Sequence, residues 1–154
     1  MITTKTLLDN SENFGNNGAD IKIEFEAPTY DVSQKKLYFK GYANSSKPGS
    51  KYEVKVAFFD IVMDYQDFLD HKWNLSKEIL LDKPIKVDCK CKSYVFNGCL
   101  KGNLANDCAL YTNAELTNYI KKTDREEKNP ENKPFGCKHV VAAIKQILDG
   151  IDNI

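Results

Sequence analysis

GCKHVVAAIKQIL (residues 136–148) places a cysteine and a histidine, one residue apart, at the start of an apolar helical pattern. The apolar residues after this pair recur at helical spacing, namely Val140, Ile144, Ile147, Leu148 and Ile151. A similar pair, Cys89-Lys90-Cys91, follows a segment with an extended pattern. Three thiols and one imidazole are the donor set of a tetrahedral zinc site. The sequence therefore predicts one Zn²⁺ ion, bound by Cys89, Cys91, Cys137 and His139, that joins a strand to a C-terminal helix.

The spacing within each pair suits this role. In an extended segment, residues two apart point to the same face, so Cys89 and Cys91 would face one point while Lys90 faces away. Cys137 lies where the chain enters the helix, and a helix N-terminus favours a thiolate over a thiol. Four protein ligands would leave no coordination position for water. We therefore expect a structural site and no hydrolytic chemistry.

The other cysteines and histidine have different expected roles. Five cysteines, without a recognisable secretory signal, favour metal binding over a disulfide framework. Cys99 lies close to the first pair in sequence and is the first alternative to a named ligand. Cys108 is expected to be a small core residue. His71, near the end of a predicted helix, is expected to be a surface or capping residue and not a ligand.

Composition limits the classes of function. The chain has 154 residues, enough for one domain with a small appended unit, and its 22 basic and 22 acidic side chains cancel. Zero net charge argues against a dedicated binder of nucleic acid or anionic membranes. No apolar run approaches the roughly 20 residues that span a bilayer, so no membrane partner is expected.

The patterns along the chain predict three regions. Residues 1–19 are polar and predict a flexible N-terminal arm. Residues 20–86 show alternating patterns at 21–26, 37–42 and 52–56, which predict an antiparallel sheet, and a helical pattern at 61–69 that Asp60 would cap. Residues 87–154 form the zinc-binding unit. It would contain a hairpin at 94–100, a helix after Gly102, an exposed loop at 121–134 and the C-terminal helix.

These regions predict an α+β fold, with an antiparallel β-sheet, packed helices and a zinc-stapled β-hairpin–α C-terminal unit. The order Cys-x-Cys, spacer, Cys-x-His resembles the SWIM-type zinc finger. The resemblance covers residues 87–149 and includes the apolar helix start after His139. It implies a strand hairpin followed by a helix, with a spacer that is longer here than in most cellular members.

A narrower resemblance concerns the spacer. Long-spacer fingers in structural proteins of tailed bacteriophages have an aromatic run after the first cysteines and an Asn-Pro … Pro … Gly-x-Cys-Lys-His pattern. The matching residues are Tyr94, Phe96, Asn129, Pro130, Pro134, Gly136, Cys137, Lys138 and His139. The usual order ends Pro-Gly-x-Cys, whereas this chain has Pro134-Phe135-Gly136-Cys137.

This resemblance implies a non-enzymatic structural or adaptor protein of a tailed-bacteriophage virion, in the portal, head–tail or tail region. Such a protein would be made in the host cytoplasm and would contact other virion proteins within a multi-subunit assembly. Tyr38 and Tyr42 would then lie at a subunit contact, because aromatic residues are enriched there. Alternatively, they cover a helix.

Two other classes of function are weighed. A SWIM-type regulatory module would bind protein or nucleic acid, the latter through a local patch of lysines, namely Lys90, Lys92, Lys101, Lys121 and Lys122. An enzyme is not expected, because zinc would occupy the thiols that a Cys–His dyad needs and no phosphate loop or zinc-protease motif occurs. Asp60, Asp64 and Asp67 form an acidic helix face, which is usually solvated and less often a hard-cation site.

Overall fold

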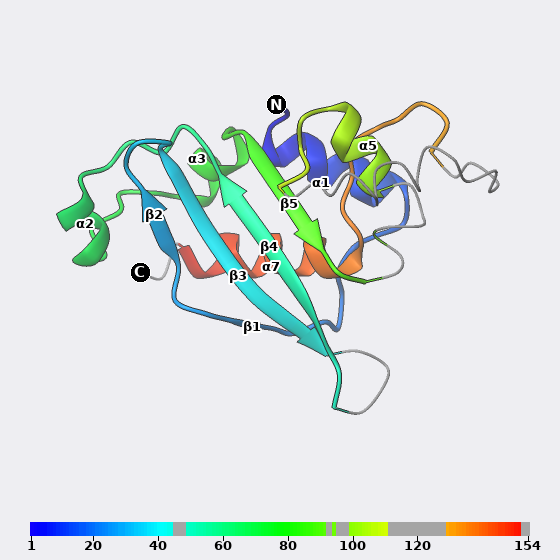
Figure 1. Ribbon diagram of the computed structural model, residues 1–154, viewed down its shortest axis with the longest axis horizontal. Coiled ribbons are helices and arrows are strands. Elements are labelled where there is room, and N and C mark those ends of the chain that lie inside the picture. The colour runs from blue at the N-terminus through cyan, green and yellow to red at the C-terminus, as the bar shows by residue number, and fades with distance from the viewer. Residues whose placement is uncertain (45–48, 92–93, 95–98, 111–128, 152–154) are drawn as a thin grey trace.

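The computed structural model describes residues 1–44, 49–91, 94, 99–110 and 129–151. These residues form an open antiparallel sheet of five strands with helices packed against it (Figure 1). The strands are β1 (Ile23–Phe25), β2 (Thr29–Asp31), β3 (Lys36–Asn44), β4 (Lys51–Phe58) and β5 (Ile85–Cys89). The helices are α1 (Thr4–Asn13), α2 (Tyr65–Leu69), α3 (Lys77–Leu81), α5 (Cys99–Ala105) and α7 (Lys138–Ile151). The predicted α+β fold class is confirmed.

The strand order is β1-β3-β4-β5, and all paired strands are antiparallel. The short strand β2 also pairs with β3, beyond the end of β1. Pro28 lies between β1 and β2, where its missing N–H interrupts the ladder. The three strands predicted from alternation correspond to β1, β3 and β4, whereas the alternation did not predict β2.

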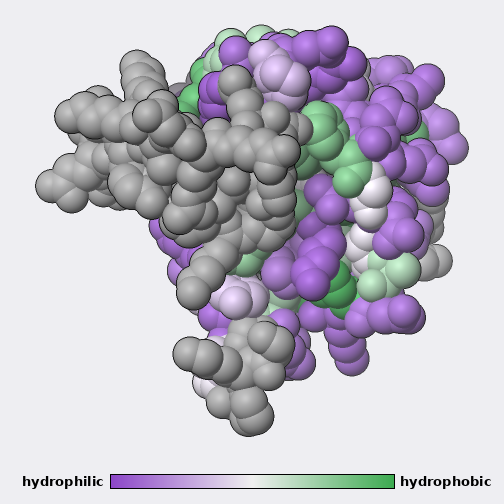
Figure 2. Space-filling model, turned by 90° about the vertical axis from the view of Figure 1, so that its right-hand side faces the viewer, coloured by the Kyte–Doolittle hydropathy of each residue, from purple (hydrophilic) through white to green (hydrophobic). Residues whose placement is uncertain are grey.

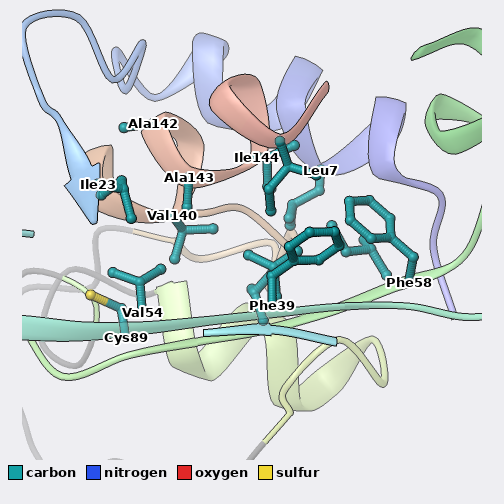
Figure 3. Close-up of a cluster of buried hydrophobic side chains, with 14 of the residues drawn as sticks. Leu7, Ile23, Phe39, Val54, Phe58, Cys89, Val140, Ala142, Ala143 and Ile144 are labelled. Atoms are coloured by element: carbon teal, nitrogen blue, oxygen red, sulfur yellow. The ribbon is translucent and has the colours of Figure 1, made fainter. Parts of the chain in front are cut away.

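The core lies between the sheet and α7. Alternate residues of β3 and β4 are buried on the face toward this helix: Leu37, Phe39, Ala43, Val54, Val56 and Phe58. Val140, Ala143 and Ile144 of α7 point toward the sheet, where Val54 and Phe39 lie (Figure 3). Each fully buried aliphatic side chain contributes about 1.5–3 kcal/mol. The apolar stripe predicted for the C-terminal helix therefore covers the sheet.

The N-terminal residues are not the flexible arm that their polarity predicted. They contain α1, whose first turn is capped by the Thr3 hydroxyl, which accepts the Thr6 N–H at 3.3 Å. Leu7 and Ser11, four residues apart on one face of the helix, are fully buried. A few buried side chains are enough to anchor this helix, and so few are hard to recognise in a polar sequence. The prediction of a flexible arm is therefore wrong for residues 4–13.

The predicted boundary at residue 86 falls within β5. This strand pairs with β4 from Ile85 to Cys89, and a single cluster of buried residues extends from Leu7 to Ile151. The strand that carries the first ligands is therefore part of the main sheet. None of the helices in the described part of the chain combines the length and the apolar character needed to cross a membrane.

The helix predicted at 61–69 is shorter than its pattern suggested. Asp60 has a left-handed backbone (φ 57°), and the Tyr30 hydroxyl donates to the Ile61 carbonyl and accepts the Met63 N–H. The Ile61 carbonyl, which a helix starting at residue 61 would pair with the Tyr65 N–H, is thus bound by a side chain instead. Helix α2 therefore begins at Tyr65 with Asp64, not Asp60, as its N-cap.

The predicted hairpin at 94–100 also differs from the structure. Cys99 and Leu100 are buried in the first turn of helix α5, although Asn97 and Gly98 lie outside the described residues. Much of the helix expected after Gly102 and most of the loop expected at 121–134 likewise lie outside the described residues.

Candidate metal centre

The first two candidate ligands lie at the end of β5. Cys89 pairs with Val54 of β4, and its side chain lies on the face that α7 covers (Figure 3). The Lys90 N–H donates to the Glu53 carbonyl at 3.1 Å, which continues the sheet pairing by one residue. Cys91 is buried, whereas the Lys90 side chain is half exposed. The predicted alternation of the Cys89-Lys90-Cys91 segment is confirmed.

The second pair lies at the N-terminus of α7. Cys137 immediately precedes the helix, and its carbonyl accepts the Val141 N–H at 3.0 Å. Cys137 therefore occupies the N-cap position, where the helix dipole favours a negative sulfur. His139, in the first turn, directs Nδ1 toward the sulfurs of Cys89 and Cys137.

The four side chains converge on one point. Their donor atoms all lie within 4.8 Å of one another, and the His139 Nδ1 is 4.0 Å from each of the sulfurs of Cys89 and Cys137. Zinc lies about 2.3 Å from sulfur and about 2.0 Å from nitrogen, so a regular tetrahedron separates a sulfur from the nitrogen by about 3.5 Å and two sulfurs by about 3.8 Å. The cluster therefore fits a metal ion after small side-chain adjustments.

The cluster is also enclosed. The four ligand residues are at most 6% exposed. The end of the molecule at which β5 ends and α7 begins faces the viewer in Figure 2, where the described surface is mainly hydrophilic. A site that is buried on all four donors suits an ion held for structural reasons better than one that exchanges water or substrate.

The thiol pKa values differ although the three sulfurs are neighbours. The pKa of Cys91 is lowered because Cys137 and Cys89 donate hydrogen bonds to its thiolate. The pKa of Cys89 is raised because its proton is held between Cys137 and Cys91. Burial raises the pKa of Cys137 to about 12. Without a cation the cluster therefore favours one thiolate, and a divalent ion is needed to stabilise three.

Helix α1 holds the loop that carries the second pair. The buried Ser11 hydroxyl accepts the Gly136 N–H at 2.8 Å, and the Asn16 amide donates to the Gly136 carbonyl at 3.0 Å. Asn10 donates to the Pro134 carbonyl at 2.9 Å. A Cβ on residue 136 would lie 2.7 Å from Val140 Cγ1, so this close approach requires glycine. The sequence did not reveal these partners, because they lie more than 100 residues apart.

A buried polar chain supports the site from the other side. The Tyr94 N–H donates to the Cys91 sulfur at 3.3 Å, and the Tyr94 hydroxyl donates to the Val87 carbonyl at 3.2 Å. Asn103 donates to this hydroxyl at 2.9 Å and accepts the Phe135 N–H at 3.0 Å. The chain thus connects the strand carrying Cys89 with the loop before Cys137. In the sequence, this chain of hydrogen bonds was indicated only by Tyr94, which follows Cys91 by three residues.

The remaining candidates lie outside the cluster. Cys99 and Cys108 are buried but do not belong to the group of four, so Cys99 does not replace a named ligand in the described structure. His71 is exposed just after α2, with a left-handed backbone (φ 55°). The lysines Lys92, Lys121 and Lys122 of the predicted basic patch lie outside the described residues.

The acidic residues near α2 do not form a metal-binding group among the described residues. Asp64 instead caps α2, accepting the N–H groups of Gln66 at 2.7 Å and Asp67 at 3.4 Å.

No family model, curated protein or solved structure matches this chain.

Proposed function

We propose that Cys89, Cys91, Cys137 and His139 hold one zinc ion whose role is structural. The observation that carries this proposal is the convergence of three sulfurs and one imidazole nitrogen, all buried, within 4.8 Å. Soft thiolates with an imidazole favour zinc over hard cations such as Mg²⁺ or Ca²⁺. Four protein donors complete a tetrahedron and leave no position for substrate, which supports a non-enzymatic protein.

The ion would join β5 to the start of α7. These elements carry the ligands and also belong to one core, so coordination would add to the apolar packing of helix on sheet. Structural zinc sites contribute about 10 kcal/mol or more of binding free energy at neutral pH, which is comparable to the whole stability of a small domain. The metal-free protein is therefore expected to be much less stable.

Metal analysis of the purified protein tests this proposal. We expect one zinc per chain by mass spectrometry, and loss of zinc in the variants Cys89→Ser and His139→Ala. Cys108→Ser is the matched control, because Cys108 is equally buried but lies outside the cluster. A stably folded wild-type protein without metal, or a control variant that loses zinc as readily as the ligand variants, would contradict the proposal.

We further propose that the protein is a structural or adaptor component of a tailed-bacteriophage virion that contacts other virion proteins. The resemblance of the Cys-x-Cys and Cys-x-His segments to phage fingers supports this role, together with zero net charge. The face of β3 and β4 opposite α7 carries no described helix (Figure 1). Tyr38 and Tyr42 alternate along β3 with the buried residues and are therefore half-buried on this opposite face. Such a face offers aromatic contact area to a neighbouring subunit.

The alternative role is a nucleic-acid-binding module. On the same sheet face Lys40 and Lys55 both pair with Glu53, and Lys90 pairs with Asp88, so two carboxylates offset most of the positive charge of these three lysines. This pairing favours protein contacts over phosphate contacts. Mass spectrometry of purified phage particles tests the virion role, which is refuted if the protein is absent. DNA affinity that falls steeply with salt would favour the alternative.

A further inference from the structure

The segment 60–70, DIVMDYQDFLD, presents an unusual surface at the end of the molecule opposite the metal centre (Figure 1). Ile61 and Phe68 anchor the segment in the core, at 1% and 8% exposure. The Trp73 indole donates to the Phe68 carbonyl at 2.9 Å, and the rings of Phe68 and Trp73 stack at 5.4 Å. The backbone is therefore fixed before any partner binds, which lowers the entropic cost of binding.

Three apolar side chains of this segment point into solvent. Val62 is 79% exposed, and Tyr65 and Leu69 are each 51% exposed. Tyr65 and Leu69 are four residues apart and are neighbours on the surface of α2, and one side of the Tyr65 ring stacks on the buried Phe68 ring at 5.9 Å. Val62 lies three residues before Tyr65 in the sequence, and exposed apolar side chains that gather on one fixed segment are typical of a contact site.

Acidic side chains surround these residues. Asp60, Asp64, Asp67 and Asp70 are exposed, and the segment contains no lysine or arginine. Within the described parts of the chain, none of the four carboxylates belongs to an ion pair, whereas Glu24, Glu53 and Asp88 all pair with lysines. The α2 surface, defined as these four aspartates with Val62, Tyr65 and Leu69, thus combines an apolar centre with an uncompensated negative rim.

We propose that the α2 surface binds a basic amphipathic segment of a different protein. Apolar side chains of that segment would pack against Val62, Tyr65 and Leu69, while its lysines or arginines would face the aspartates. Charge complementarity selects this occupant, because anionic lipid and nucleic acid would be repelled. Two copies of the chain meeting symmetrically here would place like charges together. The contact does not depend on the metal or on the virion role.

The test uses the intact zinc-loaded protein and a labelled peptide of about fifteen residues, made of leucine and lysine with leucines at helical spacing. Matched peptides carry the same residues in shuffled order, or glutamine in place of lysine. Fluorescence anisotropy is measured at about 0.05 and about 0.5 M salt. We expect the amphipathic lysine peptide to bind more tightly than both matched peptides and to weaken at high salt.

Variants locate the contact. Val62→Ser with Leu69→Ser is expected to weaken binding about tenfold or more. Asp67→Asn with Asp70→Asn is expected to weaken it and to reduce its salt dependence. The control is Ile79→Ser with Glu78→Gln, an exposed apolar–acidic pair on α3, which should leave affinity unchanged.

Three results would overturn the proposal: no binding by the wild-type protein, equal binding of the shuffled peptide, or undiminished binding by the α2 variants. Zinc content is measured for each variant. A failure here with zinc retained refutes the α2 contact alone and leaves the proposed metal site standing.

Discussion

Replacing Ser11 by alanine tests whether α1 holds the loop that carries the second ligand pair. The Ser11 hydroxyl is fully buried, accepts the Gly136 N–H at 2.8 Å and donates to the Leu7 carbonyl at 2.6 Å. Alanine would leave the Gly136 N–H buried without a partner, which costs about 1–3 kcal/mol. The variant also loses the hydrogen bond to the Leu7 carbonyl. This carbonyl lies within α1 and has a second lone pair, so the loss of that bond adds little to the cost. We therefore expect the free energy of unfolding to fall by about 2 kcal/mol.

Urea unfolding of the zinc-loaded protein, followed by circular dichroism, measures this change from the shift of the midpoint at constant slope. Ser33→Ala is the control, because Ser33 is exposed and bonds only to the Asp31 side chain within the described residues. It should change stability by less than about 0.5 kcal/mol. Both variants remove a serine hydroxyl. The difference between their changes in unfolding free energy therefore reports the burial of the Ser11 hydroxyl and its hydrogen bond to Gly136.

A double-mutant cycle sharpens the test. Asn16 donates to the carbonyl of the same Gly136, so Ser11→Ala and Asn16→Ala should not be additive. If Ser11→Ala costs no more than Ser33→Ala, the hydrogen bond from α1 does not support the ligand loop. An additive cycle would show that the two contacts act independently.

Other predictions follow from the same contacts. Gly136→Ala should destabilise the protein by about 1–3 kcal/mol, because the new Cβ would lie 2.7 Å from Val140 Cγ1. Gly150→Ala should instead stabilise the protein by about 0.5–1 kcal/mol, because Gly150 lies on α7 with open space around it. Similar shifts of the urea midpoint in the two variants would contradict this contrast. Zinc binding at pH 7 should release about two protons, since two clustered thiols have a raised pKa and only that of Cys91 is lowered, so zinc affinity should rise with pH. Calorimetry in buffers of different ionisation enthalpy counts these protons, and release of three would contradict the expected count. Cys99→Ser should retain one zinc per chain by mass spectrometry, and zinc loss would identify Cys99 as a ligand.

The sequence predicted the features that depend on local periodicity. Alternation of apolar residues identified β3 and β4, and helical spacing after His139 identified α7, because each pattern has one buried face. The convergence of two cysteine-containing pairs followed from ligand chemistry and from the side-chain directions in a strand. All four predicted ligand residues belong to the observed cluster.

The sequence could not predict the features that depend on distant partners. Helix α1 buries Leu7 and Ser11, which is too weak a pattern to distinguish from a polar arm. The Asn103 side chain bonds to Tyr94 and to the Phe135 N–H, a pairing visible only after folding. Helix α2 was predicted too long because the distant Tyr30 hydroxyl binds the Ile61 carbonyl and Asp60 has a left-handed backbone, neither of which the local pattern shows.

The position of α7 has a consequence for biosynthesis. This helix spans residues 138–151 and supplies the layer that covers the sheet, so a ribosome must translate the strands long before their cover exists. Until then the buried faces of β3 and β4 stay open to other hydrophobic surfaces, including those of chaperones. Two of the four donors are also translated late, so zinc can complete its coordination only once the growing chain has delivered residue 139. Folding and metal uptake are thus expected to coincide, once residues 137–151 have left the ribosome.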